Sequence, residues 1–147
     1  MIIGGIATIV RGVRRMTADI DAVVRGDDIR PRALLGILAK HRIAPRIERA
    51  LEFARENLVL LLRHQPSGVD LDLSFGWTRF EHDALERRET ARYGRVAAPM
   101  ARAEDLVVFK AMAARPKDVE DACLAAALPG HRPRAGASTP PRTRRAG

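Results

Sequence analysis

Gly4-Gly5, thirteen intervening residues and then Asp19-Ile20-Asp21-Ala22-Val23-Val24 predict the architecture of this chain. The β-branched residues of the second segment favour a strand, and alternate residues of a strand point to the same side. Asp19 and Asp21 therefore present two carboxylates at one place. The glycine pair allows the backbone to come close to a phosphate, and a helix beginning after it directs free N–H groups outward. The pattern predicts a phosphate-binding turn beside a carboxylate-bearing strand.

A second pair of carboxylates lies in Val69-Asp70-Leu71-Asp72. The alternation over 69–75 favours a strand, and the preceding turn Gln65–Gly68 joins it to the apolar run 57–62, so the two are expected to form a hairpin. Asp70 and Asp72 share one face of their strand. Either of them can supply a third carboxylate to the site of the first pair.

The rest of the chain alternates between helix and strand. Besides the segments above, we expect helices over 6–11, 32–41, 50–55, 80–90, 103–114 and 117–127, and a strand over 95–98. Arg115-Pro116 separates the last two helices, because a residue before proline avoids the helical region. The fold class is therefore α/β, equally describable as α+β: a small, mixed, twisted sheet flanked by helices, with a C-terminal helical pair.

Composition limits the class of protein. The chain has 147 residues, 46% hydrophobic and 30% charged, which fits one soluble domain over residues 1–130. No apolar run approaches the ~20 residues that a membrane span needs, so we expect no membrane association. The single cysteine excludes an internal disulfide and fits a cytoplasmic location. Residues 131–147 contain no Leu, Val or Ile and are expected to form a disordered Arg/Pro-rich tail.

The formal charge of +8 arises mostly in that tail. Five arginines and no acid lie in residues 131–147, and 8 − 5 leaves +3 for residues 1–130. The body is therefore mildly basic. This gives slight support to an RNA partner, because a positive surface raises encounter rates with polyanions.

Clustered carboxylates indicate a metal site. Two adjacent carboxylates repel each other unless a cation lies between them, and hard divalent ions such as Mg²⁺, or Mn²⁺, prefer oxygen ligands. A lone pair of Asp residues on a strand is often only a solvent-facing feature. The upstream glycines and the second pair favour a metal site instead, and a phosphate turn beside it suits a nucleoside triphosphate (NTP) as substrate.

These motifs resemble a known family. Gly4-Gly5-Ile6-Ala7 with Arg15-Met16-Thr17-Ala18-Asp19-Ile20-Asp21 resembles the opening motif of the polymerase-beta-like nucleotidyltransferases. The similarity is to the small bacterial branch that includes the AbiEii-type toxins of toxin–antitoxin systems and uncharacterised relatives. Ser67–Gly76 resembles that branch's third-carboxylate strand, and Arg102–Leu106 with Lys110 and Arg115–Asp118 resembles its C-terminal helical motif. The resemblance covers residues 2–128.

The resemblance implies roles for individual residues. Asp19 and Asp21 match the first two metal ligands, and Asp72 matches the third, with Asp70 as its competitor.

Four further residues are candidates for binding the nucleotide, together with Gly4 and Gly5. Lys110 is expected to reach the triphosphate, although a lysine on an apolar helix can also extend its amine to water. Asp118 is expected to orient Lys110 or to contact the acceptor, and it can equally be a helix cap. For Arg15 and Thr17, a phosphate contact and a plain polar loop are equal alternatives.

The implied function is transfer of a nucleoside monophosphate from an NTP to a hydroxyl, with release of pyrophosphate. The implied acceptor is a tRNA 3′ end or a protein hydroxyl, and the implied partner is a cognate antitoxin. Because the chain opens almost directly on the glycine pair, an N-terminal helix is expected to be absent. A degenerate, non-catalytic module that binds a protein partner is therefore the alternative function.

Overall fold

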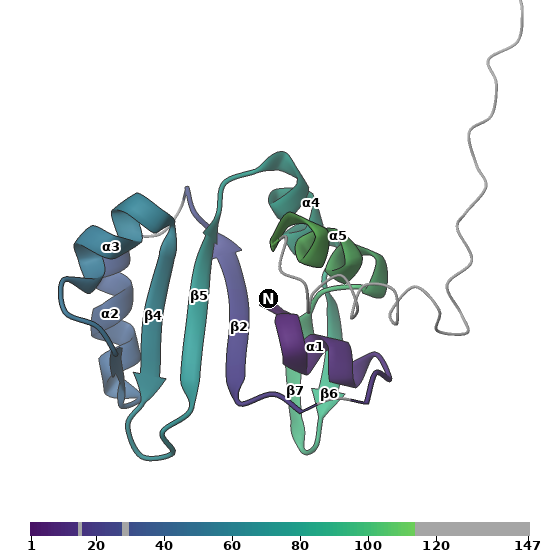
Figure 1. Cartoon of the computed structure of the whole chain (residues 1–147), viewed down its shortest axis with the longest axis horizontal. Coiled ribbons are helices and arrows are strands. Elements are labelled where there is room, and N and C mark those ends of the chain that lie inside the picture. Colours follow the sequence, from purple (N-terminus) through teal and green to yellow (C-terminus); the bar gives the residue numbers. More distant parts are fainter. Residues whose placement is uncertain (15, 28–29, 114–147) are drawn as a thin grey trace, which may run out of the picture.

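The computed structural model describes residues 1–14, 16–27 and 30–113 of the chain (Figure 1). Within these residues, helices and strands alternate around one mixed sheet of seven strands. The strands are β1 (Ile2–Ile3), β2 (Asp19–Arg25), β3 (Ile43–Pro45), β4 (Val59–His64), β5 (Asp70–Gly76), β6 (Glu89–Tyr93) and β7 (Val96–Met100). The helices are α1 (Gly4–Val10), α2 (Pro31–Lys40), α3 (Ala50–Asn57), α4 (Arg79–Arg87) and α5 (Ala103–Ala113). The expected fold class is confirmed.

The two carboxylate-bearing strands are neighbours in the middle of the sheet. The strand order is β3-β4-β5-β2-β1-β7-β6, and β2 and β5 run parallel. β4 and β5 form the expected antiparallel hairpin. In the parallel pair, Asp19 lies opposite Asp70 and Asp21 lies opposite Asp72. This register places all four carboxylates on one face of the sheet, because side chains alternate between faces along each strand.

The other face of β4 and β5 is covered by helices. Its core consists of Ala50, Ala54, Leu60, Leu62, Leu73 and Phe75, with residues of α2 packed against it. Side chains alternate between the two faces along both strands, so Leu62 and Leu73 lie in this core whereas Leu61 and Asp72 lie on the opposite face of the sheet. Burial of this apolar set holds α2 and α3 against the sheet.

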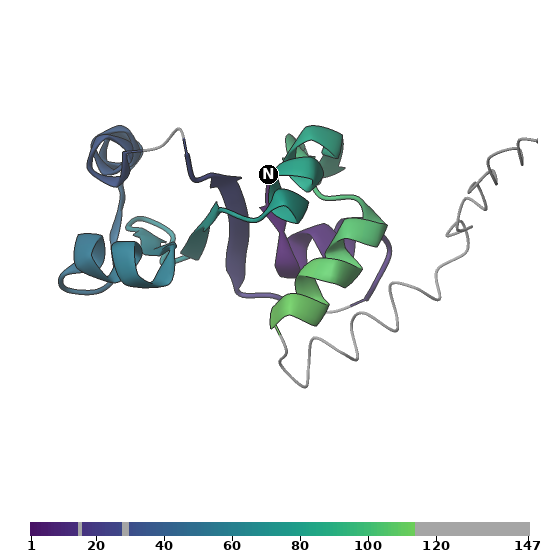
Figure 2. The same cartoon turned by 90° about the horizontal axis from the view of Figure 1, so that it is seen from above.

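A second apolar cluster holds the other half of the chain together. Ala7 of α1, Ala101 and Leu106 of α5 are buried there, and β1 packs against them. Figure 1 shows α2 and α3 beside β4 at one end, and α1, α4 and α5 at the other, with β2 and β5 between them. Figure 2 shows the same separation from above. No helix in the described part of the chain has the length and apolar character of a membrane span.

Three strands were not expected from the sequence. β1 has only two residues and β3 only three, so neither has enough length for an alternating pattern. The helix expected over 80–90 ends at Arg87, and β6 begins at Glu89 and pairs with β7. β6 is mostly exposed on both faces, and neither face needs a row of apolar residues. Its sequence therefore lacks the regular alternation that marks a half-buried strand. The second helix of the C-terminal pair and the tail lie outside the described residues.

Helix α4 begins with a capping box, which predicts a stability effect. The Thr78 hydroxyl accepts a hydrogen bond from the Glu81 amide at 3.2 Å, and the Glu81 carboxylate accepts one from the Thr78 amide at 2.9 Å. Thr78→Ala should lower the free energy of unfolding by ~1 kcal/mol, since it leaves a first-turn N–H without its partner. Urea denaturation measures this. Thr78→Ser keeps the hydroxyl and should be close to wild type, and an equal loss in both variants would contradict the capping role.

Candidate active site

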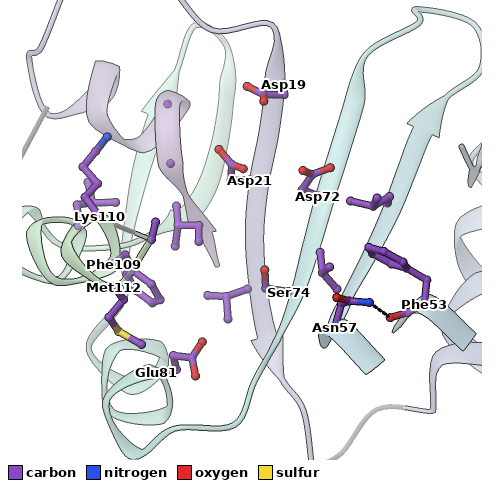
Figure 3. Close-up of a pocket in the computed structure, with 18 residues that line it drawn as sticks. Asp19, Asp21, Phe53, Asn57, Asp72, Ser74, Glu81, Phe109, Lys110 and Met112 are labelled. Carbon is purple, nitrogen blue, oxygen red and sulfur yellow. Dashed lines mark hydrogen bonds between the residues drawn. The ribbon is translucent and has the colours of Figure 1, made fainter. Parts of the chain in front are cut away.

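A cavity of about 680 Å³ lies over the carboxylate face of β2 and β5 (Figure 3). It is lined by six of the residues predicted from the sequence: Asp19, Asp21, Asp72, Gly4, Gly5 and Lys110. These residues come from four separate elements, namely β2, β5, α1 and α5. Figure 3 shows the three carboxylates along the two strands, and the lysine on the α5 side. Cavities of this size are typical of sites for small ligands.

Asp70 has partners outside the cavity, although it shares a strand face with Asp72. The Arg63 guanidinium donates to both of its carboxylate oxygens, at 2.6 and 3.2 Å. Arg46 forms a further ion pair with it at 3.0 Å. The hydrogen bond from Arg63 is the main cause that lowers the pKa of Asp70. Because Asp72 lines the cavity and Asp70 does not, Asp72 is the better candidate for the third carboxylate.

Asp72 is in a different electrostatic environment. Burial is the main cause that raises its pKa, Arg46 opposes this shift, and the neighbouring carboxylates Asp19 and Asp70 add to it. One Arg46 nitrogen lies 2.8 Å from Asp72 Oδ1 as an ion pair. That oxygen is buried, yet it accepts no well-directed hydrogen bond from the described residues. A buried carboxylate oxygen in this condition favours a cation as its partner.

The glycine pair makes room for the site. Gly4 has φ +61°, a backbone conformation that side chains rarely adopt, and a Cβ there would overlap the Asp21 carboxylate. A Cβ on Gly5 would overlap the side chain of Thr17. The sequence pattern predicted close approach of a phosphate at these glycines. The structure adds a second reason for them, which is the close packing of Asp21 and Thr17 against the start of α1.

Thr17 supports the first carboxylate. Its hydroxyl donates to Asp19 Oδ1 at 2.8 Å. Thr17 is not among the residues that line the cavity. Within the described part of the chain, its visible role is therefore to orient Asp19.

Lys110 is buried in the cavity wall. It is 5% exposed, so its amine does not extend to bulk water as the simple alternative for an apolar helix required. Phe109 and Met112 of the same helix line the cavity with it. The helix is held to α4 by an ion pair of 2.7 Å between Arg87 and the buried Asp105. Asp105 belongs to the C-terminal motif and here joins two helices.

Sequence reasoning missed two charged residues around the carboxylates. Glu81 lines the cavity, and its Thr78-x-x-Glu81 pattern is a helix-start signal that was available in the sequence. Arg46 follows the short strand β3, which pairs with β4, and its side chain reaches Asp70 and Asp72 of β5. No local pattern marks Arg46, because its partners Asp70 and Asp72 are distant in sequence.

The donor set fits a divalent cation only after some rearrangement. Across residues 1–14, 16–27 and 30–113, no three His, Cys, Asp or Glu side chains form a group that could hold a metal ion. The carboxylates share a cavity and a face, but the expectation that they lie close enough to share an ion is not met in the structure. Asp19 is held by Thr17 and Asp72 by Arg46. The chemistry of the donor set nevertheless suits Mg²⁺, because three carboxylates line one cavity and Asp72 Oδ1 is buried without a well-directed hydrogen bond from the described part of the chain.

Two candidate residues lie outside the described residues, namely Arg15 and Asp118. Comparison with protein families identifies a match that covers most of the chain. Residues 1–127 match the family described as "Nucleotidyltransferase of unknown function (DUF6036)". Among curated proteins, none matches the chain.

Proposed function

Because this chain belongs to a family of nucleotidyltransferases of unknown function, we propose that it moves a nucleoside monophosphate from an NTP to a hydroxyl acceptor. One observation carries the proposal. The three candidate carboxylates, the glycine pair and Lys110 all line a single cavity, although they come from four different elements. Convergence of a carboxylate set, a tight backbone turn and a buried lysine is the requirement for binding a metal-chelated triphosphate.

In the proposed reaction, the acceptor oxygen forms a bond to the α-phosphorus, and the bond from that phosphorus to pyrophosphate breaks. The hydroxyl proton passes to water. Asp19, Asp21 and Asp72 would hold Mg²⁺ or Mn²⁺. When bound, the divalent ions supply charge stabilisation for the attacking oxygen and the departing pyrophosphate.

The remaining walls of the cavity suit the other parts of a nucleotide. Phe109 and Met112 offer an apolar surface on the α5 side, and Phe53 and Leu61 offer one on the α3 and β4 side. A nucleoside base can pack against such side chains. Gly4 and Gly5 at the start of α1 leave the backbone open to a phosphate, and Lys110 of α5 supplies a positive charge to the same cavity.

The finer identity rests on the sequence resemblance. We propose that the acceptor is a tRNA 3′ end or a protein hydroxyl, and that the chain is the toxin of an AbiEii-type toxin–antitoxin pair. The mildly basic body, with +3 over residues 1–130, gives slight support to the RNA acceptor. A cognate antitoxin would then be its protein partner.

A transfer assay tests the proposal. The full chain is incubated with each of the four NTPs, labelled at the α-phosphate, together with Mg²⁺ or Mn²⁺ and either total tRNA or no RNA. The expected result is label on tRNA or on protein, with release of an equal amount of pyrophosphate. Absence of pyrophosphate release with every nucleotide and both metals would contradict the proposed function.

Lys110→Ala tests the nucleotide side of the cavity. Loss of a charge-assisted contact of ~1.5–3 kcal/mol should weaken nucleotide binding or turnover by ~10-fold or more. Isothermal titration with a non-hydrolysable NTP analogue measures the affinity. Lys40→Ala is the matched control, because Lys40 is exposed at the end of α2. Unchanged affinity and turnover in Lys110→Ala, with only stability altered, would make Lys110 a structural residue.

A further inference from the structure

Arg46 is the cation that contacts the candidate third carboxylate. Its backbone N–H donates to the Leu61 carbonyl at 3.0 Å, so the residue is fixed beside β4. Its guanidinium bridges two carboxylates, at 2.8 Å from Asp72 Oδ1 and 3.0 Å from Asp70 Oδ2. The Arg46 side chain is only 22% exposed, which limits the screening of these ion pairs by water.

The two carboxylates that Arg46 bridges are not equivalent. Asp72 lines the cavity and has one buried oxygen without a well-directed hydrogen bond. Asp70 is outside the cavity wall and is held by Arg63 through two hydrogen bonds. A cation that binds Asp72 would take over the oxygen that Arg46 now contacts. Asp70 would still offer Arg46 its second ion pair.

From this asymmetry, we propose that Arg46 is a resident counter-ion of Asp72 that a divalent cation displaces, and that Asp70 retains the displaced guanidinium. The inference rests on the proposed function, since it assumes that Asp72 is a metal ligand. It also gives a reason for the paired Asp70 and Asp72 on one strand face. Asp72 is the exchangeable site for a cation, and Asp70 is the permanent site for Arg46.

The charge of Arg46 then opposes metal binding. A divalent ion at Asp72 must displace one positive charge and remains close to it afterwards, and like charges at such short range in a partly buried site repel strongly. Removal of the charge should tighten metal binding. A residue that merely orients Asp72 as a ligand has the opposite effect, because its loss weakens metal binding.

Mn²⁺ affinity of the purified full chain separates these roles, measured by electron paramagnetic resonance at constant ionic strength. Arg46→Gln removes the charge and keeps a hydrogen-bond donor, so it should lower the Mn²⁺ dissociation constant by about tenfold. Arg63→Gln is the matched control, because Arg63 contacts Asp70 and carries the same charge. Its dissociation constant should stay within about threefold of wild type.

Thermal melting gives a second readout that does not depend on catalysis. Without added metal, Arg46→Gln should melt below wild type, because Asp70 and Asp72 lose a neutralising partner. Added Mn²⁺ should raise the melting temperature more in the variant than in wild type, since a tighter ligand stabilises the folded state more. Equal or weaker Mn²⁺ affinity in Arg46→Gln, with wild type binding the metal, would overturn the counter-ion role alone. Absence of Mn²⁺ binding in both proteins would overturn the proposed function with it.

Discussion

Asp21→Asn is expected to reduce nucleotide transfer by at least about 100-fold, because changes that only support a metal ligand already cost ~10–100-fold. Asp21 lines the cavity between the glycine turn and the Asp72 strand. An amide is nearly the same size as a carboxylate, but it has lost the charge that holds a divalent ion. The α-labelled NTP assay measures the loss.

The fold should survive this change. Asp21 lies opposite Asp72 on a face with four carboxylates, and removal of one negative charge relieves repulsion there. Asp21→Asn should therefore remain folded and show a cooperative thermal transition like that of wild type. Asp83→Asn is the matched control, because Asp83 is an exposed residue of α4 that does not line the cavity. Full transfer activity in Asp21→Asn would show that another residue holds the metal.

Gly4→Ala is expected to impair both stability and transfer. The left-handed backbone at Gly4 costs an alanine about 1–2 kcal/mol, and its Cβ would overlap the Asp21 carboxylate. Either α1 shifts or Asp21 turns away, so transfer should also fall by about tenfold or more, as expected when a catalytic group is misplaced. Urea denaturation and the transfer assay measure the two effects separately.

The same substitution elsewhere provides its control. Gly36 lies in the exposed part of α2, and a Cβ there meets nothing within 4 Å. Gly36→Ala should therefore stabilise the chain by about 0.5–1 kcal/mol, because alanine favours a helix over glycine. Equal behaviour of the two variants would show that the contact between Gly4 and Asp21 has no special importance.

The central part of the fold was predictable because its signals are local. Alternation marked β2 and β5, the turn Gln65–Gly68 marked the hairpin of β4 and β5, and Pro31 marked the start of α2. The edges of the sheet were not predictable in this way. β1 and β3 are held by pairing with longer strands, and β6 follows a helix without any break in its charged pattern.

The residues of the candidate site also fall into those that local sequence patterns predict and those that only the tertiary structure reveals. Asp19, Asp21 and the glycine pair lie within one motif, so their meeting could be inferred from strand periodicity and the turn. Arg46 could not be inferred, because only the pairing of β3 with β4 brings its guanidinium to Asp72. The choice between Asp70 and Asp72 was also open in sequence, since both share one face. Two features of the structure distinguish them: Arg63 pairs with Asp70, and Asp72 lines the cavity whereas Asp70 does not.

Joint binding of metal and nucleotide is the most direct measurement of whether this cavity is a nucleotidyltransferase site. Mn²⁺ is titrated into the full chain with and without a non-hydrolysable NTP analogue, and into the variant with Asn at positions 19, 21 and 72. Wild type should bind both Mn²⁺ and the nucleotide, and each ligand should increase the affinity of the chain for the other. The triple variant should lose Mn²⁺ binding. A wild-type chain that is folded but binds neither Mn²⁺ nor nucleotide would contradict a catalytic site, and it would point to a module that only binds a protein partner.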